Sequence, residues 1–200
     1  MAKKAPGRLN KTRVRYDRLD KLIKDLGKKV SIKVGIIGEK AAEIHKDSGL
    51  TNAQLGAIHE FGATIPVTPK MRAYLHSIGI HLSSDTDTIN IPTRSFLRAS
   101  LLNDNGKTLK KEVVKELNKN LLSTDRELNA AGGVKLLESA VHALAESAYF
   151  RVLEAFTSGG FGQWPPISEA TRKNRTFPDR PPLFDEGHLM QSIYYEIKGL

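Results

Sequence analysis

The amino-acid sequence predicts an α+β fold, in which a small mixed or antiparallel sheet packs against two long helices. Residues 30–38, VSIKVGIIG, alternate between apolar and other side chains, as half-buried strands do. Residues 193–197, IYYEI, alternate in the same way and are expected to return to the sheet. Two stretches, from about 94 to 121 and from 134 to 157, instead carry apolar residues at helical spacing. We therefore expect a single domain over residues 30–200, preceded by a basic N-terminal arm and helix at 1–29.

The N-terminal segment carries all of the excess positive charge. Residues 1–33 hold 12 Lys and Arg against 3 Asp, a balance of +9, whereas the remaining 19 basic and 19 acidic residues cancel. Residues 1–12 are expected to form a flexible arm, and the helical spacing of Leu19, Leu22, Ile23 and Leu26 predicts a helix that Gly27 ends. A basic arm on a neutral body favours a local contact with DNA phosphates or an acidic protein surface, although a solvated tail is the alternative. The residues expected to make this contact are Arg8, Lys11, Arg13, Arg15, Arg18, Lys21 and Lys24.

The region from 39 to 102 is expected to contain one short helix and further strands. Residues 39–50 are polar and are expected to form a loop. Thr51 and Gln54 have the spacing of a capping box, and Gly62 is placed to end the helix that follows. Two Ile-Pro steps, at 65–66 and 91–92, indicate strand edges because proline cannot donate within a central strand. We expect the sheet to be built from residues 30–37, the 65–92 region and 193–197.

The C-terminal half is expected to hold the two long helices and then a long loop. Gly132 and Gly133 are expected to break the chain between the helices. Residues 158–185 are rich in Gly and Pro and read as a loop with a short helix at about 168–174. Because so long a loop is unusual in a compact domain, we expect it to order only against a neighbouring subunit. Asp185 is expected to cap a final short helix.

The pair His59–Glu60 resembles the start of a zinc-protease motif, which needs a second His four residues after the first. That position is Ala63, so the pair is interpreted as the last turn of a helix, where a His favours the negative end of the helix dipole. His76 and His81 are five apart, which suits neither a helical nor a strand face for shared ligands. We expect them to be ordinary surface histidines, and His142 to face solvent.

The remaining patterns predict neither an enzyme nor a membrane protein. There is no phosphate-binding Gly-rich loop opening a helix, no nucleophile elbow and no cysteine, so no cofactor and no metal are expected. There is no apolar run long enough to cross a membrane and no secretory signal. The absence of cysteine fits a protein made in a reducing compartment.

Two segments resemble a family of tailed-bacteriophage proteins described as neck, tail-completion, tail-component or virion-morphogenesis proteins. In the first, IHEFG (58–62) is followed by an Ile-Pro step and then IPTRSFLR (91–98), where family members typically read Ile-Pro-Ala-Arg-Pro-Phe-Leu-Arg. The second comprises WPPISEATRKN (164–174) and PPLFDEGHLMQSI (181–193), similar to Trp-x-Pro-Leu-Ser-x-x-Thr and Leu-x-Asp-Thr-Gly-x-Leu-x-x-Ser-Ile. Thr93, Ser95 and Glu186 depart from the family pattern. The two segments cover about half of the chain, in the family's order.

The resemblance implies a structural virion protein with an α+β fold, which joins head and tail or completes the tail end as one subunit of a ring. Its partners would be further copies of itself, neighbouring neck, connector or tail proteins, and non-specifically the DNA in the ring lumen. It would lie in the virion after synthesis in the bacterial host cytoplasm. The residues expected at the subunit interface are Phe61, Arg94, Phe96, Arg98, Phe161, Trp164, Pro165 and Pro166. The alternatives are a DNA-binding protein acting through the basic arm and a metal-dependent hydrolase acting through His59 and Glu60.

Overall fold

The computed structural model describes residues 30–45, 48–102, 104, 106–123 and 130–200. The chain combines helices with short strands, which confirms the α+β class. It divides into two compact units, which are described here one at a time. The single domain expected over 30–200 stays a prediction. The basic residues of the N-terminal arm, Arg8 to Lys24, lie outside the described residues.

The larger unit comprises residues 34–106 and 148–194. It contains the end of β1 (Ser31–Gly35), the last part of α7 (Ala130–Ser158) and, in chain order, α2 (Glu39–Ala42), α3 (Asn52–Phe61), β2 (Ala63–Pro66), α4 (Pro69–Ser77), β3 (Thr88–Ile91), α5 (Arg98–Leu102), α8 (Glu169–Lys173) and α9 (His188–Gln191). The described part of the smaller unit contains α6 (Lys107–Ser123), the first part of α7 and most of β4 (Tyr194–Lys198).

The strands form two separate two-stranded sheets, so the expectation of one sheet is wrong. β1 pairs with β4, and β2 pairs with β3. The second pair is antiparallel, with Ala63 opposite Ile91 and Ile65 opposite Ile89. β2 and β3 contain no buried residue. The opposed Ile65 and Ile89 are half-buried, so one face of this ribbon is only partly covered.

The core of the larger unit lies between α5, the end of α7 and α9. Its buried apolar residues are Phe96, Val152, Ala155, Phe156, Leu189 and Ile193, and Val34 of β1 and the following Ile36 pack against them. The Phe96 and Phe156 rings lie 5.0 Å apart between centroids. Gly56 lets α3 approach this core, because a Cβ there would lie 2.4 Å from Ile36 Cδ1. Val152 and Ala155 belong to the apolar stripe that the helical spacing over 134–157 predicts, and Phe156 adds to it.

The two long helices expected after residue 94 are α6 and α7. Gly132 and Gly133 do not break the chain, since both lie inside α7. Glycine costs only about 1 kcal/mol in a helix relative to alanine, so a strongly helical continuation tolerates it. No helix among residues 30–45, 48–102, 106–123 and 130–200 is long and apolar enough to cross a membrane.

The loop at 158–185 makes several hydrogen bonds within the chain, and the expectation that it orders only against a neighbouring subunit stays a prediction. It carries α8 where the sequence predicts a short helix, and Ser168 caps the start of that helix. Arg175 donates to the carbonyls of Arg180 and Pro181, and the Asp185 carboxylate accepts from the amides of Thr176 and Phe177. Asp185 therefore closes this loop, while Gly187 is the residue before α9. These side-chain bonds replace the backbone bonds that a loop without regular structure lacks.

Candidate assembly surface

Three segments far apart in the chain meet at one junction. They are residues 59–62 at the end of α3, residues 93–98 at the start of α5, and residues 164–166 in the long loop. The Arg94 amide donates to the His59 carbonyl at 2.8 Å. The Trp164 indole N–H donates to the Ser95 carbonyl at 3.2 Å. The segments that carry the phage-protein resemblance therefore interlock within the larger unit.

The Glu60 carboxylate is the centre of this junction. Its residue is 4% exposed. The carboxylate accepts hydrogen bonds from the amides of Phe96, Leu97 and Arg98, at 2.9 to 3.0 Å, and from the Ser95 hydroxyl and Arg98 Nε. The three amides belong to the first residue of α5 and the two residues before it, so the carboxylate of one helix caps the start of another.

The electrostatics of Glu60 follow from this geometry. Burial raises the pKa of its carboxyl group, but the hydrogen bonds from the Leu97 amide, the Ser95 hydroxyl and Arg98 outweigh it and bring the pKa below its ordinary value. At neutral pH the group is therefore ionised, with its oxygens engaged by protein donors. Such a carboxylate is poorly placed to take a proton from water, which argues against its use as a hydrolase base.

His59 occupies the last turn of α3, and Thr51 and Gln54 form the capping box at its start, as the sequence predicts. The dipole argument for His59 is wrong, however. Burial, then the positive charge of Arg94 and then His45, lower the pKa of His59 to about 4. The imidazole is therefore neutral at physiological pH and gains nothing from the negative end of the helix.

We expect the free energy of unfolding to fall as the pH is lowered from about 6.5 towards 4. The folded pKa of His59 lies below its ordinary value of 6.5, so the unfolded chain binds the proton first. The contribution of His59 is complete above pH 6.5 and is lost as the pH falls through about 4. The free energy of unfolding can fall by up to about 1.4 kcal/mol per pH unit through this one group. Urea denaturation at pH 7 and pH 5 measures it.

The matched variants for this experiment are His59→Gln and His142→Gln. His142 is exposed on α7, so its replacement should keep the wild-type pH dependence. His59→Gln should flatten the decline between pH 7 and pH 5. Equal slopes in the wild type and His59→Gln would show that His59 does not carry the effect.

Two of the residues expected at a subunit interface lie in the interior. Phe96 is 0% exposed and Arg94 is 7% exposed. Arg94 donates from Nε to the Pro165 carbonyl and from a terminal nitrogen to the Pro166 carbonyl, both at 3.1 Å. Their contacts are therefore made within the chain, because a fork of fixed donors suits two neighbouring carbonyls. The interface prediction is kept for the exposed members of the set.

The other members differ in exposure. Trp164 is half-buried and meets the Phe156 ring edge-on, and Phe161 is half-buried beneath Arg151. Pro165 and Pro166 are exposed. Phe61 is 64% exposed, and the Arg98 guanidinium lies 4.5 Å from the centre of its ring. Phe61, Arg98 and the two prolines thus present an aromatic and cationic surface beside the junction.

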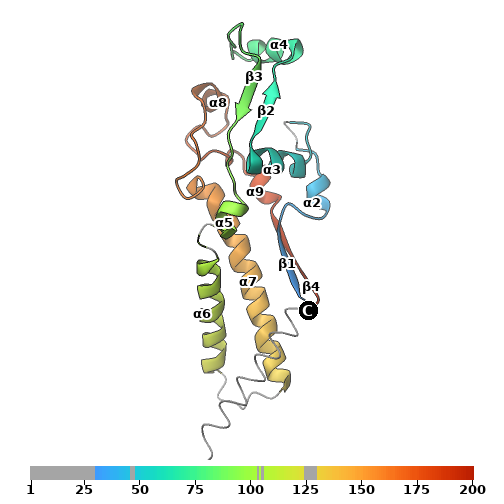
Figure 1. Ribbon diagram of the computed structural model, residues 1–200, viewed down its shortest axis with the longest axis vertical. Coiled ribbons are helices and arrows are strands. Elements are labelled where there is room, and N and C mark those ends of the chain that lie inside the picture. The colour runs from blue at the N-terminus through green and yellow to red at the C-terminus, as the bar shows by residue number, and fades with distance from the viewer. Residues whose placement is uncertain (1–29, 46–47, 103, 105, 124–129) are drawn as a thin grey trace, which may run out of the picture. The chain divides into compact units, whose positions relative to one another are not determined.

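The sequence did not predict the extension that leads away from this junction. It comprises residues 63–92, in which the β2–β3 ribbon carries α4 at its far end (Figure 1). Neither the strands nor α4 buries a residue, and Tyr74 and Ile78 are 63% and 38% exposed. Two Ile-Pro steps mark it in the sequence, one at the end of β2 towards α4 and one where β3 returns to the base.

The base of the extension is held tightly. The Thr93 hydroxyl donates to the Phe61 carbonyl at 3.0 Å. Gly62 has a φ of +76°, and a Cβ there would lie 3.0 Å from the Ile91 carbonyl oxygen and from Thr93 Oγ1. Only glycine fits this turn without strain. The junction therefore holds the extension at a fixed point on α3 and α5.

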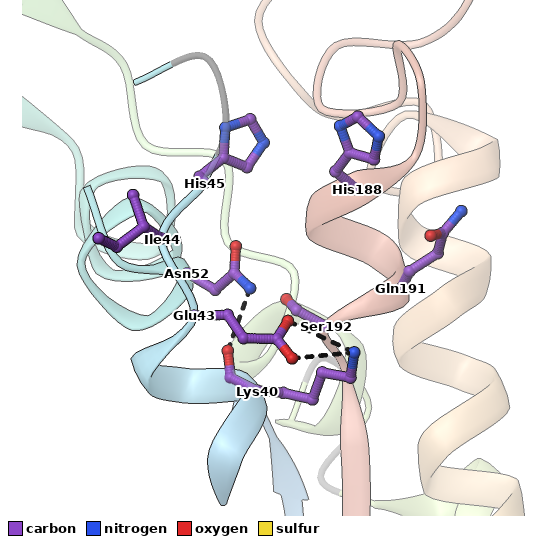
Figure 2. A pocket seen from close by; sticks show the side chains of 8 residues that line it. All are labelled: Lys40, Glu43, Ile44, His45, Asn52, His188, Gln191 and Ser192. Atoms are coloured by element: carbon purple, nitrogen blue, oxygen red, sulfur yellow. Dashed lines mark hydrogen bonds and ion pairs between the residues drawn. The ribbon is translucent and has the colours of Figure 1, made fainter. Parts of the chain in front are cut away.

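A small polar pocket lies between α2, α3 and α9. It has a volume of about 200 Å³ and is lined by Lys40, Glu43, Ile44, His45, Asn52, His188, Gln191 and Ser192 (Figure 2). Its polar groups bond across the elements, as when the Asn52 amide donates to the Lys40 carbonyl. The His45 and His188 rings meet edge-on, 5.8 Å apart. This pocket could not be predicted from the sequence, because its residues come from separate segments.

Comparisons of the chain with protein-family models, curated proteins and solved structures find no match. Within the part of the chain that the structure describes, no three His, Asp or Glu side chains are grouped to hold a metal ion. A function is therefore inferred from the junction, the exposed surface beside it and the extension.

Proposed function

We propose that the chain is a structural subunit of a ring in a tailed bacteriophage, where it joins head and tail or completes the tail end. One observation carries the proposal: the segments that resemble phage neck and tail-completion proteins interlock around Glu60. A family would keep these residues together if they build one structural feature. Here that feature is the rigid base of an exposed extension.

An extension of this kind suits a contact between subunits. A two-stranded ribbon is at best marginally stable in water, and this one has few contacts of its own to the rest of the unit. A ring requires a heterologous contact, in which one patch of a subunit meets a different patch of the next. The exposed apolar residues Tyr74 and Ile78 at the far end supply one patch. The surface of Phe61, Arg98, Pro165 and Pro166 is the proposed second patch.

The proposed role is not enzymatic. The hydrolase alternative requires Glu60 as a base, and this carboxylate already accepts five hydrogen bonds from the protein. The neutral state of His59 is maintained by burial and by Arg94. Glu60 and the His59 backbone have a structural role in the junction, where Glu60 caps α5 and the His59 carbonyl accepts from the Arg94 amide.

We expect the purified chain to form a closed oligomer of uniform mass, and Tyr74→Ser/Ile78→Ser to weaken this assembly. Truncation of interface anchors typically costs about 2 kcal/mol or more, which is about thirtyfold in affinity. Native mass spectrometry over a range of concentrations measures the change. The free energy of unfolding of the monomer should stay nearly constant, because both side chains are exposed.

Ile44→Ser is the matched control, since Ile44 is 70% exposed on a different part of the same unit. It should assemble like the wild type. Antibody labelling of purified phage particles shows independently whether the chain is present in the particle and at which part of it. A chain that stays monomeric at every concentration and is absent from particles would contradict the proposal.

The second candidate function is DNA contact through the basic N-terminal arm, which the charge balance of +9 in residues 1–33 favours. Non-specific DNA binding weakens steeply with salt, in proportion to the number of phosphates neutralised. Removal of residues 1–12, which takes away Arg8 and Lys11 but leaves Arg13, should then weaken the affinity for duplex DNA and reduce its salt dependence. If the deletion reduces particle assembly and leaves DNA affinity unchanged, the partner of the arm is a protein.

A further inference from the structure

The far end of the extension brings two histidines together. His76 lies in the last turn of α4, and His81 follows the helix after a turn. The two Nδ1 atoms are 2.8 Å apart, and the ring centroids are 4.5 Å apart at an interplanar angle of 71°. Both residues are exposed. The five-residue spacing, which suits neither a helical nor a strand face, hides this pair because the chain reverses between the two residues.

The backbone holds this reversal in place. The Gly79 amide donates to the His76 carbonyl at 3.0 Å, and the Ile80 amide donates to the Leu75 carbonyl at 2.8 Å. Gly79 has a φ of +81°, a conformation that other residues rarely adopt. The two rings are therefore positioned by the fold of the turn.

Arg72 fixes the segment that follows His81. Its guanidinium donates to the carbonyls of Ser83 and Thr86, both at 2.7 Å, and to that of Leu82 at 3.4 Å. Thr68 caps the start of α4 by accepting from the Met71 amide. The helix and the returning segment are thus braced against each other on both sides of the histidine pair. Such preorganisation lowers the entropic cost of holding a ligand between them.

The separation of the two nitrogens matches a particular coordination geometry. Two imidazole nitrogens bound at about 2.0–2.1 Å lie about 2.8–3.0 Å apart as neighbouring ligands at a right angle, but about 3.4 Å apart at a tetrahedral angle. The observed 2.8 Å is the length of the hydrogen bond between the two rings, and it also lies in the range that the right angle requires. Square-planar and tetragonal coordination by nitrogen and oxygen ligands is typical of Cu²⁺ and Ni²⁺.

We propose that His76 and His81 form a two-histidine site for a divalent transition-metal ion, with Cu²⁺ bound most tightly, then Ni²⁺. Solvent supplies the remaining ligands, because both rings are exposed and the described residues provide no third His, Asp or Glu grouped with them. Zn²⁺ binds less tightly, since it prefers a wider angle and lies below Cu²⁺ in the affinity order. The ion would tie the end of α4 to the returning segment. This site does not depend on the proposed role in a ring.

Binding of an ion requires a change in which nitrogen of one ring carries the proton. A hydrogen bond between the two Nδ1 atoms requires one ring to carry its proton on Nδ1 and the other on Nε2. A bound ion needs the lone pair of both Nδ1 atoms. The donor ring therefore releases its Nδ1 proton to solvent and takes one up at Nε2, so that the neutral pair stays neutral. Acid weakens binding, because an imidazolium ring has no lone pair to offer.

The test is a calorimetric titration of the full-length chain, without an affinity tag, with Cu²⁺, Ni²⁺ and Zn²⁺ in a non-chelating buffer. We expect one ion per chain, bound in the order Cu²⁺, Ni²⁺, Zn²⁺. His76→Ala and His81→Ala should each weaken Cu²⁺ binding by at least about tenfold, since loss of an outer-shell partner alone costs about 10–100-fold. His142→Ala removes an exposed histidine from α7 and should bind as the wild type does.

Electron paramagnetic resonance identifies the ligands directly. The spectrum of one equivalent of Cu²⁺ should show coupling to two nitrogens in the wild type and to one in either alanine variant. Circular dichroism checks that the exposed substitutions leave the helix content unchanged. Binding by the His76→Ala/His81→Ala double variant that equals the wild type, or an equal loss in His142→Ala, would overturn the assignment.

Discussion

Replacement of Glu60 by glutamine should lower the free energy of unfolding by about 3–5 kcal/mol, because this buried carboxylate accepts three backbone amides that a glutamine cannot all satisfy. The glutamine side chain is nearly isosteric, but its amide group places hydrogens against the donors at the start of α5. The amides of Phe96, Leu97 and Arg98 would then compete for one carbonyl oxygen. Each buried donor left unpaired costs about 1–3 kcal/mol. Urea denaturation at pH 7 measures the loss.

Glu169→Gln is the control for this experiment, because the Glu169 side chain is 81% exposed and pairs only with Lys173 four residues on. An exposed pair of this kind contributes about 0–1 kcal/mol. The pH dependence gives a second readout. The folded pKa of Glu60 is lowered, so its stabilisation is present above the ordinary value of 4.5 and is lost as the pH falls below it.

The acid-induced loss below pH 4.5 should be smaller in Glu60→Gln than in the wild type. This window is distinct from that of His59, which lies between about 4 and 6.5. A stable Glu60→Gln variant with wild-type acid sensitivity would show that the carboxylate does not organise the junction.

Substitution of alanine at Gly160 should be the second most destabilising change, with an expected loss of about 2–5 kcal/mol. Gly160 has a φ of +68°, and a Cβ there would lie 2.2 Å from Cδ1 and Nε1 of Trp164. The indole cannot easily move, because it packs on Phe156 and donates to the Ser95 carbonyl. The loss combines left-handed backbone strain of about 1–2 kcal/mol with overpacking of about 1–3 kcal/mol.

Gly162→Ala separates these two contributions. Gly162 has a similar φ of +76°, but a Cβ there would meet no atom within 4 Å. It should therefore show the strain without the clash and lose only about 1–2 kcal/mol. Trp164 is the single tryptophan of the chain, so its fluorescence reports directly on its surroundings. The emission should shift in Gly160→Ala and stay unchanged in Gly162→Ala. The same emission and stability in both variants would contradict the predicted clash.

Local features of the chain could be predicted from the sequence alone. The capping box of Thr51 and Gln54, the short helix after Ser168 and the strand signals around 31–35 and 194–198 are all present in the structure. The long helices are present too. These features depend on residues at most a few positions apart, and on the period of the apolar side chains, so the linear sequence contains the necessary information.

The pairing of distant residues was decided only by the tertiary structure. Glu60 meets Phe96 across 36 positions, and Arg94 meets Pro166 across 72, so no spacing rule links them. A charged residue beside an aromatic one is typical of a subunit interface and also of a buried helix cap. Only the exposure of the side chains in the folded chain distinguishes an interface from a cap. The turn of the chain at Gly79 likewise brings the His76 and His81 rings together. The sequence thus determined which elements form, while the junction and the histidine pair arise from how those elements meet, because hydrogen-bond partners are chosen by distance in space.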